Sequence, residues 1–330
     1  MPNSSNNLVY GACVYSDETL YGVDSAGARY TWAVWDALIL LTSLFGDTCI
    51  LIASIGYNAI QVHAGLIPFI QHLAIADLIL AVFFVLPGVV SVVFNGWVLG
   101  QAICACTAYL SYYAFSLSFF LIAGMTSGKL LMVLCPMRAR VWSSGRSQVI
   151  CAVMWVFCLG LPLTQSLVDK TDVCFDSRKY NCTYGYTGNI WGWLKPALFF
   201  VMALLPGMTI FGTSILLLKK ARSVIQEGLR LAGMLTVLVT SGVYIFSILP
   251  FVAYSIVEPF LEKDPTKVGQ FQLKYYSVAC AFLNFHIMSN FFIYYFTVSK
   301  FRKFVRGIVC REDQGEYFLH YISLLSSLLH

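Results

Sequence analysis

Seven long apolar runs dominate the sequence and restrict what it can fold into. They cover approximately residues 31–57, 67–93, 101–134, 148–168, 191–218, 229–257 and 271–298. A helix that crosses a membrane needs about 20 consecutive, mostly apolar residues, and each run is long enough. Only 11% of the residues are charged, whereas soluble domains average about 25%. We therefore expect an all-α membrane protein, a bundle of seven transmembrane helices.

The distribution of lysine and arginine predicts the orientation of this bundle. Basic residues gather between runs three and four, after run five and after run seven, including Arg138, Arg140, Lys219, Lys220 and Lys300. Loops rich in Lys and Arg stay in the cytoplasm, which places the C-terminus inside and the N-terminus outside. The glycosylation sequons at Asn3 and Asn181 both fall on the predicted outer side.

Three segments follow from this arrangement. Residues 1–30 form an extracellular segment, 31–298 the transmembrane bundle, and 299–330 a short amphipathic eighth helix with a cytoplasmic tail. The eighth helix presents an apolar face made of Phe301, Phe304, Val305 and Ile308. Such a helix lies in the membrane interface and binds lipids. Cys310 at its end is a candidate palmitoylation site, and an unmodified cytosolic thiol is the alternative.

Two carboxylic acids interrupt the apolar runs. Asp47 lies within the first run and Asp77 within the second. A carboxylate at such a depth costs several kcal/mol, so it must face the interior of the bundle and have partners there. If the two runs are neighbouring helices, these acids meet, and two close carboxylates do not both ionise readily.

A set of short motifs in fixed order accompanies the runs. It comprises Gly46-Asp47, Leu73-Ala74-Ile75-Ala76-Asp77-Leu78, Trp97-Val98-Leu99-Gly100 before Cys104, Trp155, Pro206, Pro250, Asn290-Phe291-Phe292-Ile293-Tyr294 and Phe301-Arg302. Over residues 30–310 the chain resembles a rhodopsin-like (class A) G-protein-coupled receptor. The resemblance implies a multi-pass receptor of the plasma membrane that binds an extracellular ligand and signals to a heterotrimeric G protein.

The resemblance also implies an ion site in the bundle. In this family the second-helix Asp binds a sodium ion with a third-helix Ser and a seventh-helix Asn, which match Asp77, Ser118 and Asn290. Asp47 adds a second carboxylate, and His286 lies one turn before Asn290. We predict a coupled ion or proton cluster of these five residues and no cofactor, with sodium at Asp77 as the one ion that the site could hold. The alternative is a neutral hydrogen-bonded core that only packs helices.

The outer halves of the helices carry the candidate ligand cavity. Its predicted lining is Tyr109, Ser111, Tyr112, Phe115, Phe251, Tyr254 and Tyr276. Aromatic linings suit largely apolar pockets, although aromatics also fill cores and mark membrane interfaces. Ser111 replaces the Asp of amine receptors, and Asn284 replaces the retinal-binding Lys of opsins. The resemblance therefore argues against a biogenic amine and against retinal, and the aromatic loop at 180–193 favours a peptide or sizeable organic ligand.

Four cysteines fall on the predicted outer side. They are Cys13, Cys104, Cys174 and Cys182. We predict a disulfide between Cys104 and Cys182, which ties the third helix to the 169–190 loop. Cys174 could pair in place of Cys182, or with Cys13, because sequence alone does not fix connectivity.

The predicted cytosolic face departs from the family pattern. Its residues are Lys129, Arg138, Lys219, Lys220, Arg230 and Tyr294. Gly128-Lys129-Leu130 replaces the family's Asp/Glu-Arg-Tyr triplet, and Arg230 stands where many members carry a Glu. Lys lacks the planar fork with which Arg pairs bidentately with carboxylates, so we expect no ionic lock of the usual kind.

Two other functions remain open at this stage. One is a receptor-like decoy or scaffold that does not couple, which the altered triplet suggests. The other is a proton- or ion-conducting bundle, which the intramembrane acids suggest, although transporters often show internal repeats and none is evident. We expect no enzymatic activity and no nucleic-acid partner, because no nucleophile–base pair, metal-ligand spacing or phosphate-binding loop stands out.

Overall fold

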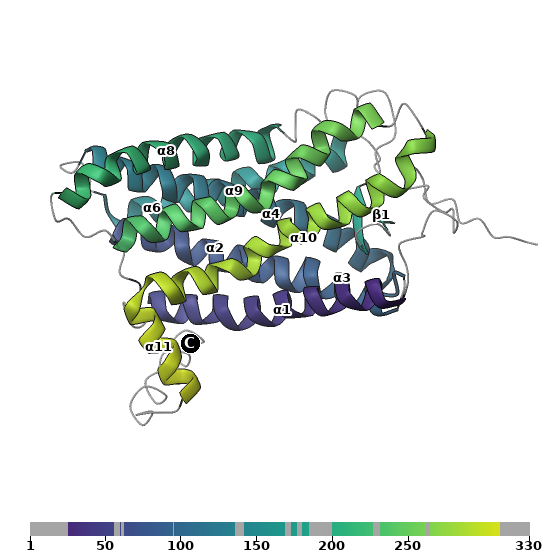
Figure 1. Cartoon of the computed structure of the whole chain (residues 1–330), viewed down its shortest axis with the longest axis horizontal. Helices are drawn as coiled ribbons and strands as arrows, with labels where there is room; N and C mark the ends of the chain where they lie inside the picture. The colour runs from purple at the N-terminus through teal and green to yellow at the C-terminus, as the bar shows by residue number, and fades with distance from the viewer. Residues whose placement is uncertain are drawn as a thin grey trace, which may run out of the picture.

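The structure is a computed structural model that describes residues 26–55, 60, 63–94, 96–135, 142–168, 173–176, 180–184, 200–226, 232–261 and 265–310. Within these ranges seven helices are long and apolar enough to cross a membrane. They lie lengthwise beside one another (Figure 1). The prediction of a seven-helix bundle is therefore confirmed.

The seven spans are built from longer and shorter helical pieces. In chain order they are α1 (Ala26–Ile55); η2 (Ala64–Leu66), α2 (Ile67–Leu80), η3 (Ala81–Val85) and α3 (Leu86–Val93), which together form the second span; α4 (Gly100–Leu134); α6 (Ser144–Val168); η4 (Phe200–Leu204) with α8 (Leu205–Gln226); α9 (Ala232–Leu261); and α10 (Pro265–Thr297).

Two prolines inside the spans lie two residues after the end of a π-helical turn. η3 precedes Pro87 and η4 precedes Pro206. Proline lacks an N–H, and its ring clashes with the carbonyl one turn earlier, so the wider π turn relieves the crowding. The second and fifth spans therefore carry built-in irregularities, while Pro162 lies inside the continuous helix α6.

Helix α4 occupies the centre of the bundle. It packs against α2, α6, α8 and α9, and α1 packs between α2 and α10. Its fully buried side chains include Leu117, Leu121, Ile122 and Met125. On α6, by contrast, Val149, Val153 and Val156 are exposed along one face. A row of exposed apolar residues suits a surface that contacts lipid.

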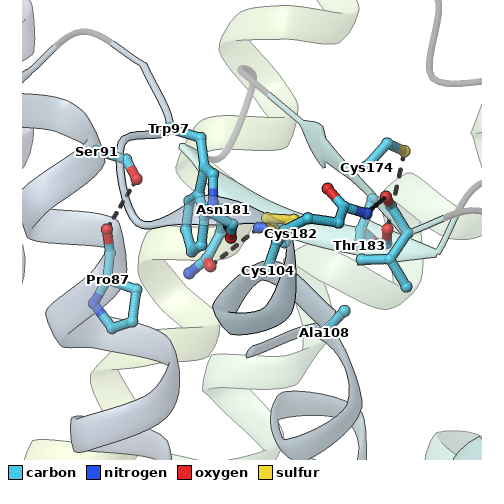
Figure 2. Close-up of a disulfide and its surroundings, with 12 residues drawn as sticks. Pro87, Ser91, Trp97, Cys104, Ala108, Cys174, Asn181, Cys182 and Thr183 are labelled. Atoms are coloured by element: carbon cyan, nitrogen blue, oxygen red, sulfur yellow. Dashed lines mark hydrogen bonds between the residues drawn. A yellow bond between two sulfur atoms is a disulfide. The ribbon is translucent and has the colours of Figure 1, made fainter. Parts of the chain in front are cut away.

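A two-stranded hairpin covers one end of the bundle, here called the hairpin end. β1 (Val173–Asp176) pairs antiparallel with β2 (Asn181–Tyr184), with Val173 opposite Tyr184. A disulfide between Cys104 and Cys182 fastens β2 to the start of α4 (Figure 2). This is the predicted pairing. Cys174 is also disulfide-bonded, and its partner is not among the described residues.

The opposite end, here called the α11 end, carries the predicted eighth helix. α11 (Ser299–Cys310) begins just after α10 and turns away from the bundle axis (Figure 1). Phe301 and Val305 are buried, while Lys300, Lys303 and Arg306 are exposed. The amphipathic helix is therefore confirmed, but Ile308, predicted on its apolar face, is exposed. The side chain of Cys310 lies outside the described residues.

Candidate functional site

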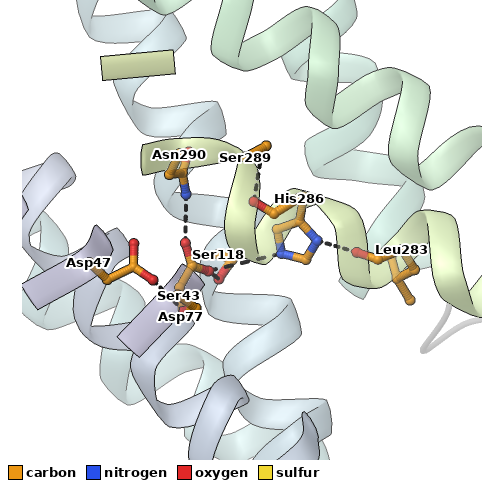
Figure 3. Close-up of polar contacts among 8 residues, drawn as sticks. All are labelled: Ser43, Asp47, Asp77, Ser118, Leu283, His286, Ser289 and Asn290. Carbon is orange, nitrogen blue, oxygen red and sulfur yellow. Dashed lines mark hydrogen bonds and ion pairs between the residues drawn. The ribbon is translucent and has the colours of Figure 1, made fainter. Parts of the chain in front are cut away.

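The Asp77 carboxylate is the centre of a polar cluster within the bundle. Asp77 is fully buried in α2. Ser118 of α4 donates a hydrogen bond to its Oδ1 at 3.3 Å, and Asn290 of α10 donates to its Oδ2 at 2.6 Å (Figure 3). Three predicted members of the cluster therefore meet, and they come from three different helices.

Asp47 joins this cluster from α1. It is buried, and its Oδ2 accepts a hydrogen bond from Ser43 at 2.5 Å. Its Oδ1 is buried without a hydrogen-bond partner in the described part of the chain. The Asp47 and Asp77 carboxylates interact electrostatically. The sequence analysis missed Ser43, although it lies one helical turn before Asp47.

His286 approaches Asp77 from the side facing the hairpin end. Its Nε2 lies 4.0 Å from Asp77 Oδ1, and its Nδ1 is hydrogen-bonded to the carbonyl oxygen of Leu283 (Figure 3). A carbonyl oxygen only accepts, so Nδ1 carries the hydrogen and Nε2 is the atom free to gain or lose a proton. Aromatic rings of Phe115, Phe119 and Tyr244 surround the imidazole.

Two buried tyrosines complete the interior around the cluster. Tyr244 packs edge-on against Phe119 at 4.9 Å between ring centroids, and its hydroxyl has no hydrogen-bond partner among the described residues. The same holds for the hydroxyl of Tyr294. Tyr294 was predicted on the cytosolic face, but it is only 1% exposed and packs against Phe301. In this conformation it belongs to the core. Tyr244 was not predicted at all.

The structure corrects one predicted modification site. Asn181 is 2% exposed, its Nδ2 donates to the carbonyl oxygen of Phe84 at 2.7 Å, and its Oδ1 accepts from the amide of Cys182 at 3.0 Å. A glycan would have to be attached to that same Nδ2. Glycosylation at Asn181 is therefore incompatible with this fold, and the sequon there is a structural asparagine. The other sequon, at Asn3, lies outside the described residues.

Two predicted cavity residues on α4 are hydrogen-bonded to backbone carbonyls. The Tyr109 hydroxyl donates to the carbonyl oxygen of Leu159 in α6 at 3.1 Å. Ser111 is buried, and its hydroxyl donates to the carbonyl oxygen of Ala108 in its own helix at 3.0 Å. Both side chains therefore satisfy backbone carbonyls.

The remaining cavity residues fall into separate groups. Tyr112 lies under the hairpin against Tyr184, with ring centroids 5.4 Å apart. Phe115 packs between Phe84 and His286. Phe251 and Tyr254 pack with Tyr275 between α9 and α10. The side chain of Tyr276 is outside the described part. Tyr112 and Phe115 thus connect the hairpin to the cluster.

Comparison with known proteins agrees with this architecture. Residues 49–294 match the family model of the 7 transmembrane receptor (rhodopsin family). The chain belongs to the rhodopsin family. The matched region holds the second to sixth spans, most of the seventh, and the residues Asp77, Ser118 and Asn290.

Named relatives of this receptor are similar at low identity. The annetocin receptor of Eisenia fetida is 23% identical over 44% of this chain, and the cholecystokinin receptor type A of Cavia porcellus is 22% identical over 63%. The mesotocin receptor of Rhinella marina is 28% identical over 43%. The matched stretches span 34%, 50% and 36% of those relatives' own lengths, so the chain covers half of them or less.

The receptor's α11 end carries some of the predicted basic face. Lys129 is half-buried in α4, and Lys219 and Lys220 are exposed near the end of α8. Arg138 and Arg230 lie outside the described residues. A hydrogen bond from Thr236 of α9 to Thr297 of α10, at 3.0 Å, joins two helices at this end. The sequence analysis did not predict this contact, because two threonines in apolar helices carry no distinctive signal.

A third acid, half-buried between α1 and α10, was missed. Asp36 of α1 lies within hydrogen-bonding reach of the Asn284 side chain of α10. Asp36, Ser43 and Asp47 are spaced by seven and four residues, which places them on one face of a helix. That spacing was visible in the sequence and could have revealed Asp36 as an interior residue.

Proposed function

We propose that this receptor lies in the plasma membrane with its hairpin end outside the cell, binds an extracellular ligand there and signals to a heterotrimeric G protein at its α11 end. The observation that carries the proposal is the buried cluster around Asp77. It joins α1, α2, α4 and α10 midway along the bundle, between the ligand-binding and coupling ends. Polar groups packed between helices can adopt two different sets of contacts. A ligand that binds one of these arrangements better shifts the receptor towards it.

Two features support the orientation. The Cys104–Cys182 disulfide lies at the hairpin end, and disulfides persist in oxidising surroundings outside the cytoplasm. Lys219, Lys220 and the basic face of α11 lie at the opposite end, where the positive-inside rule places them in the cytoplasm. The exposed lysines and arginine of α11 then face the anionic headgroups of the inner leaflet.

We propose a peptide as the ligand. The relatives are receptors for annetocin, cholecystokinin and mesotocin, which are peptides. The hairpin supplies a support for such a ligand, because the disulfide and the Asn181 hydrogen bonds fix β2 against α3 and α4. Below the hairpin, Tyr112 and Phe115 lead towards His286. A ligand that shifts these aromatics would therefore act on the Asp77 cluster.

We further propose that the cluster holds one positive charge, supplied by a sodium ion or a proton. Asp47 Oδ1 is a buried carboxylate oxygen without a partner among the described residues, and it lies beside a second buried carboxylate. Two buried acids need a compensating cation. Asp47, Asp77 and Ser118 offer oxygen ligands, which hard cations prefer. Among the described residues, no three His, Cys, Asp or Glu side chains converge on a metal position, so hydroxyl or amide oxygens would complete the shell.

A receptor that does not couple is the second candidate, and one observation favours it. Lys129 replaces the arginine of the family triplet and is half-buried, and a lysine cannot reproduce the bidentate pairing of arginine. The test is basal nucleotide exchange on a panel of G proteins in membranes that carry the chain, compared with empty membranes. Variants Lys129→Ala and Lys129→Arg are measured beside Lys303→Ala, which removes the same charge from the exposed face of α11.

The outcomes separate the two candidates. Coupling predicts exchange above that of empty membranes, lost in Lys129→Ala and retained in Lys303→Ala. A chain that is expressed at the cell surface, gives no exchange and gains it only in Lys129→Arg would be a decoy that lost coupling through this one residue. Absence of exchange in all four chains would contradict the coupling proposal.

A further inference from the structure

The carboxylate of Asp36 is half-buried and has no charged partner in the described part of the chain. It lies between α1 and α10 beside Asn284, and no lysine or arginine in the described part of the chain forms an ion pair with it. An uncompensated carboxylate within a membrane bundle is costly, and such residues mark binding sites by default. Asp36 lies eleven residues from Asp47 towards the hairpin end, about 16 Å along the helix, so it is separate from the Asp77 cluster.

Asn284 supplies a second acceptor at the same place. Its side chain is 8% exposed, and its Oδ1 is buried without a hydrogen-bond partner among the described residues. Since a carboxylate only accepts, the amide nitrogen of Asn284 faces Asp36, which leaves the amide oxygen unpaired. A buried acceptor without a donor costs about 1–3 kcal/mol. A single cationic group with several N–H donors would satisfy both the carboxylate and this oxygen.

An aromatic pair joins the same two helices next to this position. Trp35 precedes Asp36 in α1 and stacks on Phe285, which follows Asn284 in α10, with ring centroids 6.4 Å apart and planes 10° apart. The Trp35 Nε1 is also buried without a partner in the described part. The aromatic pair packs α1 against α10 at the level of Asp36 and Asn284. The carboxylate and the amide oxygen offer two acceptors to one organic cation.

We propose that Asp36 and Asn284 bind the ammonium or guanidinium group of the receptor's extracellular ligand. This proposal rests on the proposed function, in that the ligand enters from the hairpin end. On α4, Ser111 offers a cationic ligand only a hydroxyl, and that hydroxyl is already bonded to the carbonyl oxygen of Ala108. The negative charge that balances the ligand's cation therefore comes from Asp36 of α1. A peptide with a lysine, an arginine or a free amino terminus has the required chemistry.

The first test measures access and local charge without knowing the ligand. Intact cells that carry Asn284→Cys are treated from outside with cationic 2-(trimethylammonium)ethyl methanethiosulfonate or anionic 2-sulfonatoethyl methanethiosulfonate. Modification at position 284 is followed by mass spectrometry of the peptide that contains it. A focused negative site accelerates the cationic reagent by about tenfold or more relative to the anionic one, and Asp36→Asn abolishes the difference.

Matched variants keep this test decisive. Asp36→Glu retains the charge and should retain the preference for the cationic reagent, while Trp35→Cys is a second reporter in case Asn284→Cys fails to reach the surface. Equal rates for the two reagents, or a preference that survives Asp36→Asn, would overturn the site. Lack of modification at both reporters would also overturn it, because the site would then be closed to the outside.

The second test uses a peptide probe and its neutral counterpart. Thermal unfolding of the full chain in nanodiscs is measured with amidated Tyr-Arg and with Tyr-citrulline, which replaces the guanidinium by a urea of the same shape. We expect Tyr-Arg to bind about thirtyfold tighter or more, and Asp36→Asn to remove the difference. Equal stabilisation by both probes, or by neither, would refute the cation site. Nucleotide exchange is measured separately, so failure of coupling and failure of this site give different results.

Discussion

The Asn181 side chain of β2 donates a hydrogen bond from Nδ2 to the carbonyl oxygen of Phe84, across 2.7 Å. Phe84 belongs to the π-helical turn η3 of the second span. The hairpin is therefore attached to the second span by a side chain and to the third by a disulfide. An asparagine within a glycosylation sequon serves here as a structural bridge.

The first prediction concerns this bridge. Asn181→Ala leaves the Phe84 carbonyl and the Cys182 amide without partners, so we expect a loss of about 1–3 kcal/mol in stability. Thermal unfolding of the purified chain measures it. Thr183→Val removes the sequon but keeps Asn181, and should change stability little. A glycosidase-sensitive mass at Asn181 that disappears in Thr183→Val would contradict the assignment of a structural role.

The second prediction concerns the cation of the Asp77 cluster. Replacing choline chloride by sodium chloride at constant ionic strength should stabilise the receptor, by about 1–2 kcal/mol at a tenfold excess over the dissociation constant. Asp77→Asn should remove this increment, because Asp77 is the acid at the centre of the cluster. Asp36→Asn removes a carboxylate that lies apart from the cluster and serves as the control. An increment that persists in Asp77→Asn would place the sodium elsewhere.

The third prediction separates the contribution of Ser43 from that of Asp47. Ser43→Ala removes the one hydrogen-bond donor that the described residues offer to the buried Asp47 carboxylate, and we expect a cost of about 1–3 kcal/mol. In an Asp47→Asn background the same change should cost less, because the amide carries no charge to desolvate. Thermal unfolding of the four chains gives the coupling between the residues. Additive effects would show that Ser43 does not support the Asp47 charge.

Some features of this receptor could be predicted from its sequence and others could not, depending on how strongly each residue type restricts its position in a membrane bundle. The apolar runs were predicted correctly, because long apolar stretches have few places to lie except in a membrane. The meeting of Asp77, Ser118 and Asn290 followed from the family resemblance. The hydrogen bonds of Tyr109 and Ser111 were not predicted, because a residue's position along a helix says little about which backbone carbonyl its hydroxyl will reach.

Asn181 and Asp36 show two different limits of prediction from sequence. The Asn181 sequon is a local pattern, and only the fold reveals that its nitrogen is buried against Phe84. Asp36 was visible as a polar residue at helical spacing from Ser43 and Asp47, but its partner Asn284 is 248 positions away, and no local pattern connects them. Contacts between distant spans are what the sequence could not supply.

The fourth prediction concerns the Thr236–Thr297 hydrogen bond at the α11 end. Thr297→Val keeps the shape of the side chain but removes the acceptor, so the link between α9 and α10 weakens by about 1 kcal/mol. If separation of these helices accompanies activation, basal nucleotide exchange should rise about fivefold. Thr213→Val removes a hydroxyl that bonds only within α8 and is the matched control. Unchanged exchange in Thr297→Val would show that this contact does not restrain the inactive state.

The fifth prediction concerns the contact between the start of the second span, at Gly65, and the start of α6, at Trp142 and Ser147. Gly65 packs so closely under Trp142 that an added Cβ would lie 2.0 Å from the indole Cδ1. The Trp142 indole donates to Ser147 Oγ at 2.7 Å, and Ser147 in turn donates to the Gly65 carbonyl at 2.5 Å, so the ring cannot move without breaking both bonds. Gly65→Ala should therefore destabilise the receptor by about 1–3 kcal/mol, as overpacking does. Gly212→Ala, where nothing lies within 4 Å, should be neutral or stabilise by up to about 1 kcal/mol. Equal melting temperatures for the two variants would show that the Trp142 ring yields freely and that this junction does not fix the start of α6.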